Sequence, residues 1–140
     1  MLDSRAMFSS ASPHWTTPEN TYAGLDAEFA FTMDPCPLHA DFNGLEIPWV
    51  GAVFVNPPYG RGNIIVPWIK KGWEAAQAGA LVVLLLPSRT DTRWWHEYVM
   101  KGEIRFIQGR LHFSGTKFNA PFPSAVVVFY PVDKDVKLEK

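Results

Sequence analysis

The chain has 140 residues, of which 47% are hydrophobic and 19% are charged, and its formal net charge is −1. This composition is that of a folded soluble protein, and the length allows one domain with a sizeable core but excludes two full domains. No apolar run approaches the roughly twenty residues that span a bilayer, the first residues lack the pattern of a signal peptide, and a single cysteine excludes an internal disulfide.

The first part of the chain predicts a helix, two short strands and a loop between them. The helix is expected over residues 17–29, with Thr17 as its cap, proline at the first helical position and an acid near the positive end. A short strand is predicted over residues 31–34, a loop over 35–51 and a buried strand over 52–55.

The second part alternates helices with strands. Apolar side chains that share one face predict a helix over residues 64–78, and an all-apolar run predicts the central strand over 81–86. A second helix, capped by Thr90 or Asp91, and two more strands are expected over residues 91–100, 103–108 and 124–130. A long polar and aromatic segment, residues 109–123, separates those last two strands.

This order of elements predicts an α/β fold with a mostly parallel sheet, helices on its faces and an antiparallel closing strand. Residues 1–130 are expected to form the single domain, and residues 131–140 a frayed tail. Ligands of such sheets bind beyond the carboxyl ends of the strands. Three segments are expected there: 34–36, 56–59 and 87–90.

The segment Asn56, Pro57, Pro58 and Tyr59 indicates a particular chemistry. An aromatic amine attacks a methyl sulfonium poorly because its lone pair is delocalised into the ring. An asparagine oxygen and the next carbonyl are two acceptors that favour a pyramidal, nucleophilic nitrogen. The prolines hold both acceptors in place, and the tyrosine offers a face for a flipped base. The alternative is a strand end with a Pro-Pro turn and a core tyrosine.

The chain resembles the phage-type Dam-like DNA N6-adenine methyltransferases from about Ser12 to Tyr130. The matching blocks, in order, are residues 14–18, 34–36, 55–60, 84–96, 104–106, 109–111 and 120–125. The resemblance implies a reduced class I (Rossmann-like) methyltransferase fold, S-adenosylmethionine as donor, and the 6-amino group of adenine in double-stranded DNA as acceptor. Base flipping and direct in-line transfer would then be the mechanism.

The same resemblance implies the roles of individual residues. Asn56, Pro57, Pro58 and Tyr59 would form the catalytic loop. The residues that would bind the cofactor are Trp15, Thr16, Thr17 and Pro18, which help to cover its methionine end, and Asp34, Pro35 and Cys36, which begin the first cofactor motif. Asp34 would serve the cofactor's ammonium group, although it could also cap a turn. The chain departs from the family after Cys36, where Pro-Leu-His-Ala replaces the expected glycines.

Basic residues concentrate in the second part of the chain. Residues 1–50 carry one basic residue against seven acidic ones, whereas residues 51–130 carry nine against four. This distribution fits a phosphate-facing surface or ordinary charge scatter. The expected DNA contacts are Arg61, Arg89, Arg93, Arg110 and Lys117. The segment 109–123 is expected to read DNA, with a hairpin that completes the sheet as the alternative.

Several questions stay open at this point. Cys36 and His39 have a zinc-like spacing without a second pair, so no metal is assigned. The same chemistry on RNA adenine or a protein glutamine is one rival function, and a catalytically inactive DNA-binding module of the same fold is another. The oligomeric state is open, with a dimer as one option. The expected location is the cytoplasm, and for a phage-encoded chain the host cytoplasm, where modification against host restriction would be the role.

Overall fold

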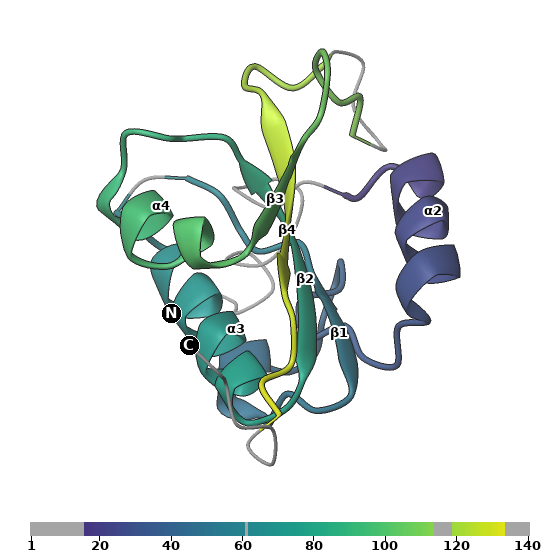
Figure 1. Cartoon of the computed structure of the whole chain (residues 1–140). Coiled ribbons are helices and arrows are strands. Elements are labelled where there is room, and N and C mark those ends of the chain that lie inside the picture. Colours follow the sequence, from purple (N-terminus) through teal and green to yellow (C-terminus); the bar gives the residue numbers. More distant parts are fainter. Residues whose placement is uncertain (1–15, 61, 114–118, 134–140) are drawn as a thin grey trace, which may run out of the picture.

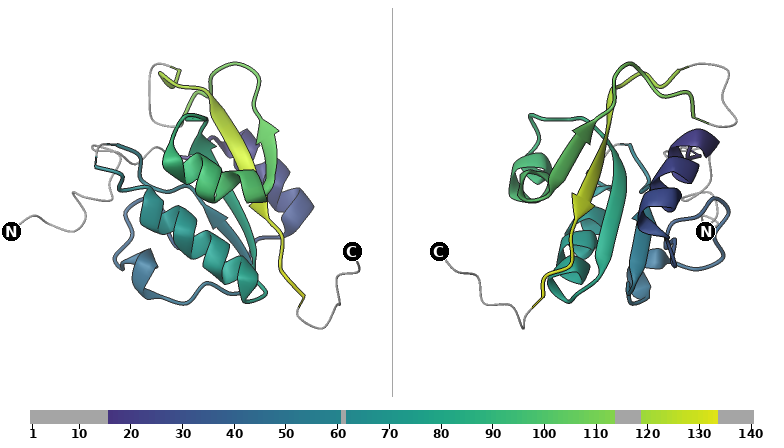
Figure 2. Two further views of the ribbon diagram at one scale, coloured as in Figure 1. Left: turned by 60° about the vertical axis from the view of Figure 1, so that its left-hand side comes forward. Right: turned by 45° about the vertical axis from the view of Figure 1, so that its right-hand side comes forward.

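The computed structural model describes residues 16–60, 62–113 and 119–133 (Figure 1). Within these residues, four strands form one sheet in the order β1-β2-β4-β3. The strands are β1 (Ala52–Val55), β2 (Leu81–Pro87), β3 (Glu103–Phe106) and β4 (Ser124–Phe129). The helices are α2 (Glu19–Phe29), α3 (Val66–Gln77) and α4 (Arg93–Glu97), and two short 3-10 helices are η1 (Gly44–Glu46) and η2 (Val99–Lys101). Figure 2 shows α3 and α4 on one face of the sheet and α2 on the other.

The sheet is mixed, and the expected mostly parallel arrangement is corrected in one respect. β1 and β2 are parallel, whereas β4 pairs antiparallel with both β2 and β3. β1, β2 and β3 therefore point the same way, and β4 lies between two of them instead of closing the edge. Apolar runs indicate where strands lie along the chain but not their order in the sheet. The sequence therefore predicts the α/β class but not the position of β4 between β2 and β3.

β2 is the centre of the core because both of its faces are covered. Residues 82–86 of this strand have 0% exposure. On one face, α3 lies so close that a Cβ added at Gly72 would be 3.2 Å from the side chain of Val82. The continuous apolar sequence of β2 follows from this double burial, since neither face leaves room for polar side chains.

Several elements are shorter than the sequence predicts. The strand expected over 31–34 is reduced to one parallel bridge between Met33 and Val53. The helix expected over 91–100 is divided into α4 and η2 by Tyr98, whose φ of −123° is not helical. β3 and β4 end at Phe106 and Phe129, and α3 begins at Val66, just before its proline. Element ends depend on local hydrogen bonds that periodicity does not report.

The expected helix caps are wrong at both predicted positions. Pro18 is the N-cap of α2 and, having no polar side chain, makes no side-chain capping bond. At α4, the N-cap is Thr92, whose hydroxyl accepts a hydrogen bond from the Trp95 N–H at 3.3 Å. Thr17 therefore precedes the N-cap of α2, and one partner of its hydroxyl, Asn56, lies in the candidate site.

α2 is held on its face of the sheet by a small number of contacts. Leu25 is its one buried residue. The Arg105 guanidinium of β3 donates to both carboxylate oxygens of Glu28 at 2.7 Å, and the Tyr22 ring lies edge-on to Phe54 at 5.1 Å. These contacts hold α2 across this face of the sheet, with Tyr22 beside β1 and Glu28 beside β3.

The chain beyond β4 stays in contact with the fold, since the Tyr130 hydroxyl donates to Glu103 Oε2 at 3.1 Å. The Val132 N–H donates to the Ala76 carbonyl at 3.0 Å, so the chain is tied to the end of α3 at this residue. Most of the predicted frayed tail, residues 134–140, lies outside the described residues. In the described part of the chain, no helix combines the length and the apolar character needed to cross a membrane.

Candidate functional site

Asn56 is the first residue after β1 and a buried polar side chain at 2% exposure. The two prolines that follow it end the ladder with β2, because proline has no N–H to donate. The Asn56 side-chain Nδ2 donates a hydrogen bond to Thr17 Oγ1 at 2.9 Å. This bond joins the predicted catalytic loop to the segment 16–18, although 39 positions separate the two residues in sequence.

Tyr59 is part of the core in this structure. Its ring is 3% exposed and lies edge-on to Phe122 at 5.4 Å and to Phe113 at 6.4 Å. Its hydroxyl donates to the Leu85 carbonyl at 2.6 Å, just beyond Leu84, the last β2 residue paired with β1. Burial raises the pKa of the Tyr59 hydroxyl well above its ordinary value, so the group stays a neutral donor. The geometry matches the core-tyrosine alternative, and the base-stacking role stays a prediction.

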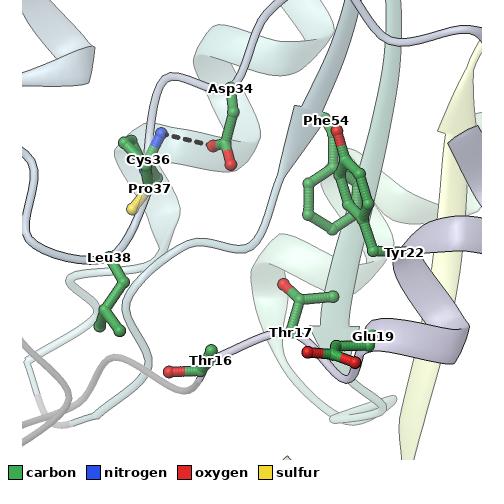
Figure 3. A pocket seen from close by; sticks show the side chains of 9 residues that line it. All are labelled: Thr16, Thr17, Glu19, Tyr22, Asp34, Cys36, Pro37, Leu38 and Phe54. Atoms are coloured by element: carbon green, nitrogen blue, oxygen red, sulfur yellow. Dashed lines mark hydrogen bonds between the residues drawn. The ribbon is translucent and has the colours of Figure 1, made fainter. Parts of the chain in front are cut away.

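A pocket of about 340 Å³ lies between α2 and the loop that carries Asp34. Three separate segments meet in it. Its lining residues are Thr16, Thr17, Glu19, Tyr22, Asp34, Cys36, Pro37, Leu38 and Phe54. Figure 3 shows Asp34 and Cys36 on one side of this pocket and the rings of Tyr22 and Phe54 on the opposite side. The pocket therefore unites the two segments that the sequence assigns to cofactor binding.

Asp34 gives the pocket a titratable acid. Its Oδ1 accepts a hydrogen bond from the Cys36 N–H at 2.9 Å, the bond drawn in Figure 3. Burial raises the pKa of the Asp34 carboxyl to about 6, although the Cys36 N–H partly offsets the shift. A buried carboxylate of this kind favours a cationic ligand, whose charge replaces the lost hydration.

Cys36 is a buried neutral thiol. It is 5% exposed, and burial together with the charge of Asp34 raises the pKa of its thiol to about 12. A thiol with such a pKa carries almost no thiolate at neutral pH, so it is not an activated nucleophile. This agrees with the interpretation of Cys36 as a small buried residue.

The turn after Cys36 forms without the glycines expected there. His39 adopts φ 59°, a left-handed conformation that glycine normally supplies and histidine tolerates better than β-branched residues. A non-glycine residue thus closes the loop around the pocket.

Five lining residues are not among those predicted from the sequence: Glu19, Tyr22, Pro37, Leu38 and Phe54. Spacing gives a usable signal for two of them. Phe54 lies two residues before Asn56 on an extended chain, so both face the same side. Tyr22 lies three residues after Glu19 on α2, where side chains share a face. No pattern in the sequence marks Pro37 or Leu38.

Two of the predicted DNA contacts lie beside two further pockets at the carboxyl ends of the strands. Arg89 lines a small pocket of about 100 Å³ together with Tyr59 and Gly60. Arg93 lines a neighbouring pocket of about 350 Å³, and its Nε lies 3.6 Å from Glu97 Oε1. The two pockets share Asn63, Thr92 and Trp94. Arg89 and Arg93 are both exposed.

The remaining predicted contacts are not brought to these pockets in the described residues. Arg110 is exposed after β3, while Phe113 in the same segment is fully buried, as the hairpin alternative expects. Trp15, Arg61 and Lys117 lie outside the described residues. Among the residues that the structure does describe, no three His, Cys, Asp or Glu side chains gather as a metal site would require.

Comparison with known proteins identifies the family. The sequence matches the family described as DNA N-6-adenine-methyltransferase (Dam) over residues 6–132. The fold is similar to a solved structure described as a class I S-adenosylmethionine-dependent methyltransferase from Listeria monocytogenes, with a TM-score of 0.46 and 16% identity. That similarity covers 70% of this chain, and this chain spans 38% of that one. No curated protein matches the sequence. Because the family match extends from residue 6 to residue 132, the chain belongs to the Dam family of DNA N-6-adenine-methyltransferases.

Proposed function

We propose that this protein transfers a methyl group from S-adenosylmethionine to the 6-amino group of adenine in double-stranded DNA. Family membership supports this proposal, and so does one structural observation. The buried Asn56 is hydrogen-bonded to Thr17, and Thr17 lines the pocket that contains Asp34. The residue proposed to bind the methyl-accepting amine therefore lies next to the pocket proposed for the methyl donor. We also infer a reduced class I (Rossmann-like) fold, in which this pocket lies where such sheets bind ligands.

The pocket residues fit the proposed cofactor. S-adenosylmethionine joins a cationic amino-acid part to an apolar adenosine, and pockets for such ligands combine apolar walls with few polar groups. Asp34 would hold the ammonium group, and Tyr22 and Phe54 supply aromatic walls. Thr16, Thr17 and Pro18 would cover one end, with Pro35 and Cys36 shaping the turn after Asp34. When bound, the cofactor supplies a methyl group on a sulfonium.

The chain's own part in the reaction is to orient the amine and stabilise its developing charge. The Asn56 Oδ1 and the Pro57 carbonyl would accept hydrogen bonds from the two N–H groups of the 6-amino group. These bonds strengthen as positive charge develops on nitrogen. They therefore stabilise the transition state more than the ground state, which lowers the barrier. Pro57 and Pro58 limit the motion of the loop, and Tyr59 would offer a face on which the flipped base stacks.

Labelled methyl transfer tests this function. The protein is incubated with S-adenosylmethionine carrying a tritiated methyl group and with duplex DNA, RNA or protein in parallel, and the products are digested and separated. We expect the label in N6-methyladenine from DNA. Label in RNA or in glutamine would identify one of the rival acceptors instead.

An inactive DNA-binding module is the second candidate, favoured by the turn at His39 and by the covered ring of Tyr59. Calorimetry distinguishes it from an enzyme. A protein that binds duplex DNA but shows no heat of binding with S-adenosylmethionine, with or without DNA, would be such a module. Cofactor binding together with methyl transfer would reject it.

A further inference from the structure

The hydroxyl of Thr17 joins the start of α2 to the loop after β1. Thr17 precedes the N-cap Pro18, whose side chain makes no capping bond. The Thr17 Oγ1 accepts a hydrogen bond from Asn56 Nδ2 at 2.9 Å. The same residue lines the pocket proposed for the cofactor, whereas Asn56 is not among the lining residues. Thr17 therefore contacts both the pocket and the catalytic loop.

The direction of this hydrogen bond bears on the chemistry of Asn56. The oxygen and nitrogen of a side-chain amide point to opposite sides, so an Nδ2 that faces Thr17 leaves Oδ1 facing away from it. An amine that donates to Oδ1 needs this orientation, because the flipped amide would present N–H groups to N–H groups. Donation from Nδ2 also polarises the amide, which makes Oδ1 a better acceptor.

We propose that Thr17 is a positioning residue for the methyl transfer, one that holds the Asn56 amide with its oxygen toward the acceptor amine. This inference rests on the proposed function. Because Thr17 also lines the pocket proposed for S-adenosylmethionine, the same residue contacts the methyl donor and orients the Asn56 amide. Asn56 is the residue that touches the substrate, and Thr17 acts through it.

Replacement of the hydroxyl with a group of equal size tests the proposal. Thr17→Val keeps the volume at the pocket and removes the acceptor, and we expect kcat to fall about tenfold, the scale of one hydrogen bond. The Kd for S-adenosylmethionine should change by less than about twofold, because the pocket keeps its shape. Thr17→Ser should restore kcat, since it restores the hydroxyl.

A matched control separates positioning from loss of stability. Thr32 also bonds β1 through its hydroxyl, which accepts from the Ala52 N–H at 3.1 Å at the other end of that strand. Thr32→Val makes the same chemical change far from Asn56, and kcat should not change. An equal fall of kcat in Thr32→Val and Thr17→Val would show a general effect of β1 and overturn the proposal.

Two further measurements test the route through Asn56. In an Asn56→Ala background, Thr17→Val should lower kcat no further, and a second tenfold loss would overturn the proposal. The side-chain amide signals of Asn56 in a proton–nitrogen spectrum should move in Thr17→Val and return in Thr17→Ser. This spectrum does not depend on activity. Asn56 signals that do not move in Thr17→Val would show that the hydrogen bond is absent and would overturn the proposal. If the signals move but the wild-type protein transfers no methyl group, the proposed function is rejected and the hydrogen bond is not.

Discussion

Asn56 is a polar residue at a buried position: it is 2% exposed, and residues this buried are usually apolar. We expect Asn56→Ala to lower kcat by roughly two to three orders of magnitude, as removal of one oxyanion-type hydrogen-bonding group does. The fold should survive, because loss of one hydrogen bond costs about 1 kcal/mol and lowers Tm by about 4 °C. Single-turnover methyl transfer and a thermal melt measure the two effects. A variant with wild-type turnover would remove Asn56 from the catalytic loop.

Asp34 makes cofactor affinity depend on pH. Burial raises the pKa of its carboxyl to about 6, so below that pH the group is largely protonated in the empty pocket. A cation that binds the carboxylate must then displace a proton. The Kd for S-adenosylmethionine should therefore rise as pH falls, by up to about tenfold per pH unit below pH 6, and level off above it.

Calorimetry between about pH 5 and pH 7 measures this dependence. Asp34→Asn is the matched control, because it keeps the shape of the carboxyl and cannot titrate. It should bind the cofactor more weakly at pH 7 and show a flat profile. A profile for the unsubstituted protein as flat as that of the control would mean that Asp34 does not contact the cation.

At the scale of elements, η1 packs through Gly44 against the loop that carries Asp34. A Cβ added at this glycine would overlap the backbone carbonyl of Pro35, the residue after Asp34. We expect Gly44→Ala to shift the Asp34 loop, to destabilise the fold by about 1–3 kcal/mol as overpacking does, and to weaken cofactor binding. Chemical denaturation and calorimetry measure both effects.

Gly24 is the matched control for that substitution. It lies within α2, and nothing is within 4 Å of a Cβ added there. Gly24→Ala should stabilise the fold by about 0.5–1 kcal/mol, because alanine favours helix interiors over glycine. If both variants had equal stability, the close approach of η1 to the Asp34 loop would be absent in solution.

The elements show how far the sequence leads. The apolar run of β2 and the prolines after Val55 predict a buried strand and its end, because these constraints act along the chain. The cap at Thr92 and the single bridge at Met33 depend on hydrogen bonds that several residues can satisfy, so their positions are not predicted. The contact between Thr17 and Asn56 is also not predicted. The two residues meet because α2 folds over β1, and hydrophobic periodicity along the chain does not report such a contact.

At the scale of the whole molecule, the strands that point the same way bring Asn56, Arg89 and the start of α4 to one edge of the sheet. We expect the double variant Arg89→Ala and Arg93→Ala to weaken duplex binding and to reduce the salt slope of log affinity by about one per arginine. Binding titrations at several salt concentrations measure this.

Lys70→Ala serves as the comparison for the arginine variants. Lys70 is exposed on α3, farther along that helix than the pockets beside α4. Its removal should leave the salt slope nearly unchanged. A slope equally reduced by Lys70→Ala would indicate diffuse attraction by net charge in place of a binding edge around Arg89 and Arg93.

The insertion of β4 between β2 and β3 also governs the order in which the protein can fold. β4 is the last of the four strands along the chain, yet it forms both of the antiparallel ladders. While the chain is being synthesised, β3 has no neighbour to join until residues 124–129 leave the ribosome, so the sheet closes late. Such non-local closure slows folding and makes it cooperative. A growing chain that stops short of β4 would leave one edge of β2 without its partner strand, open to chaperones and to pairing with other chains.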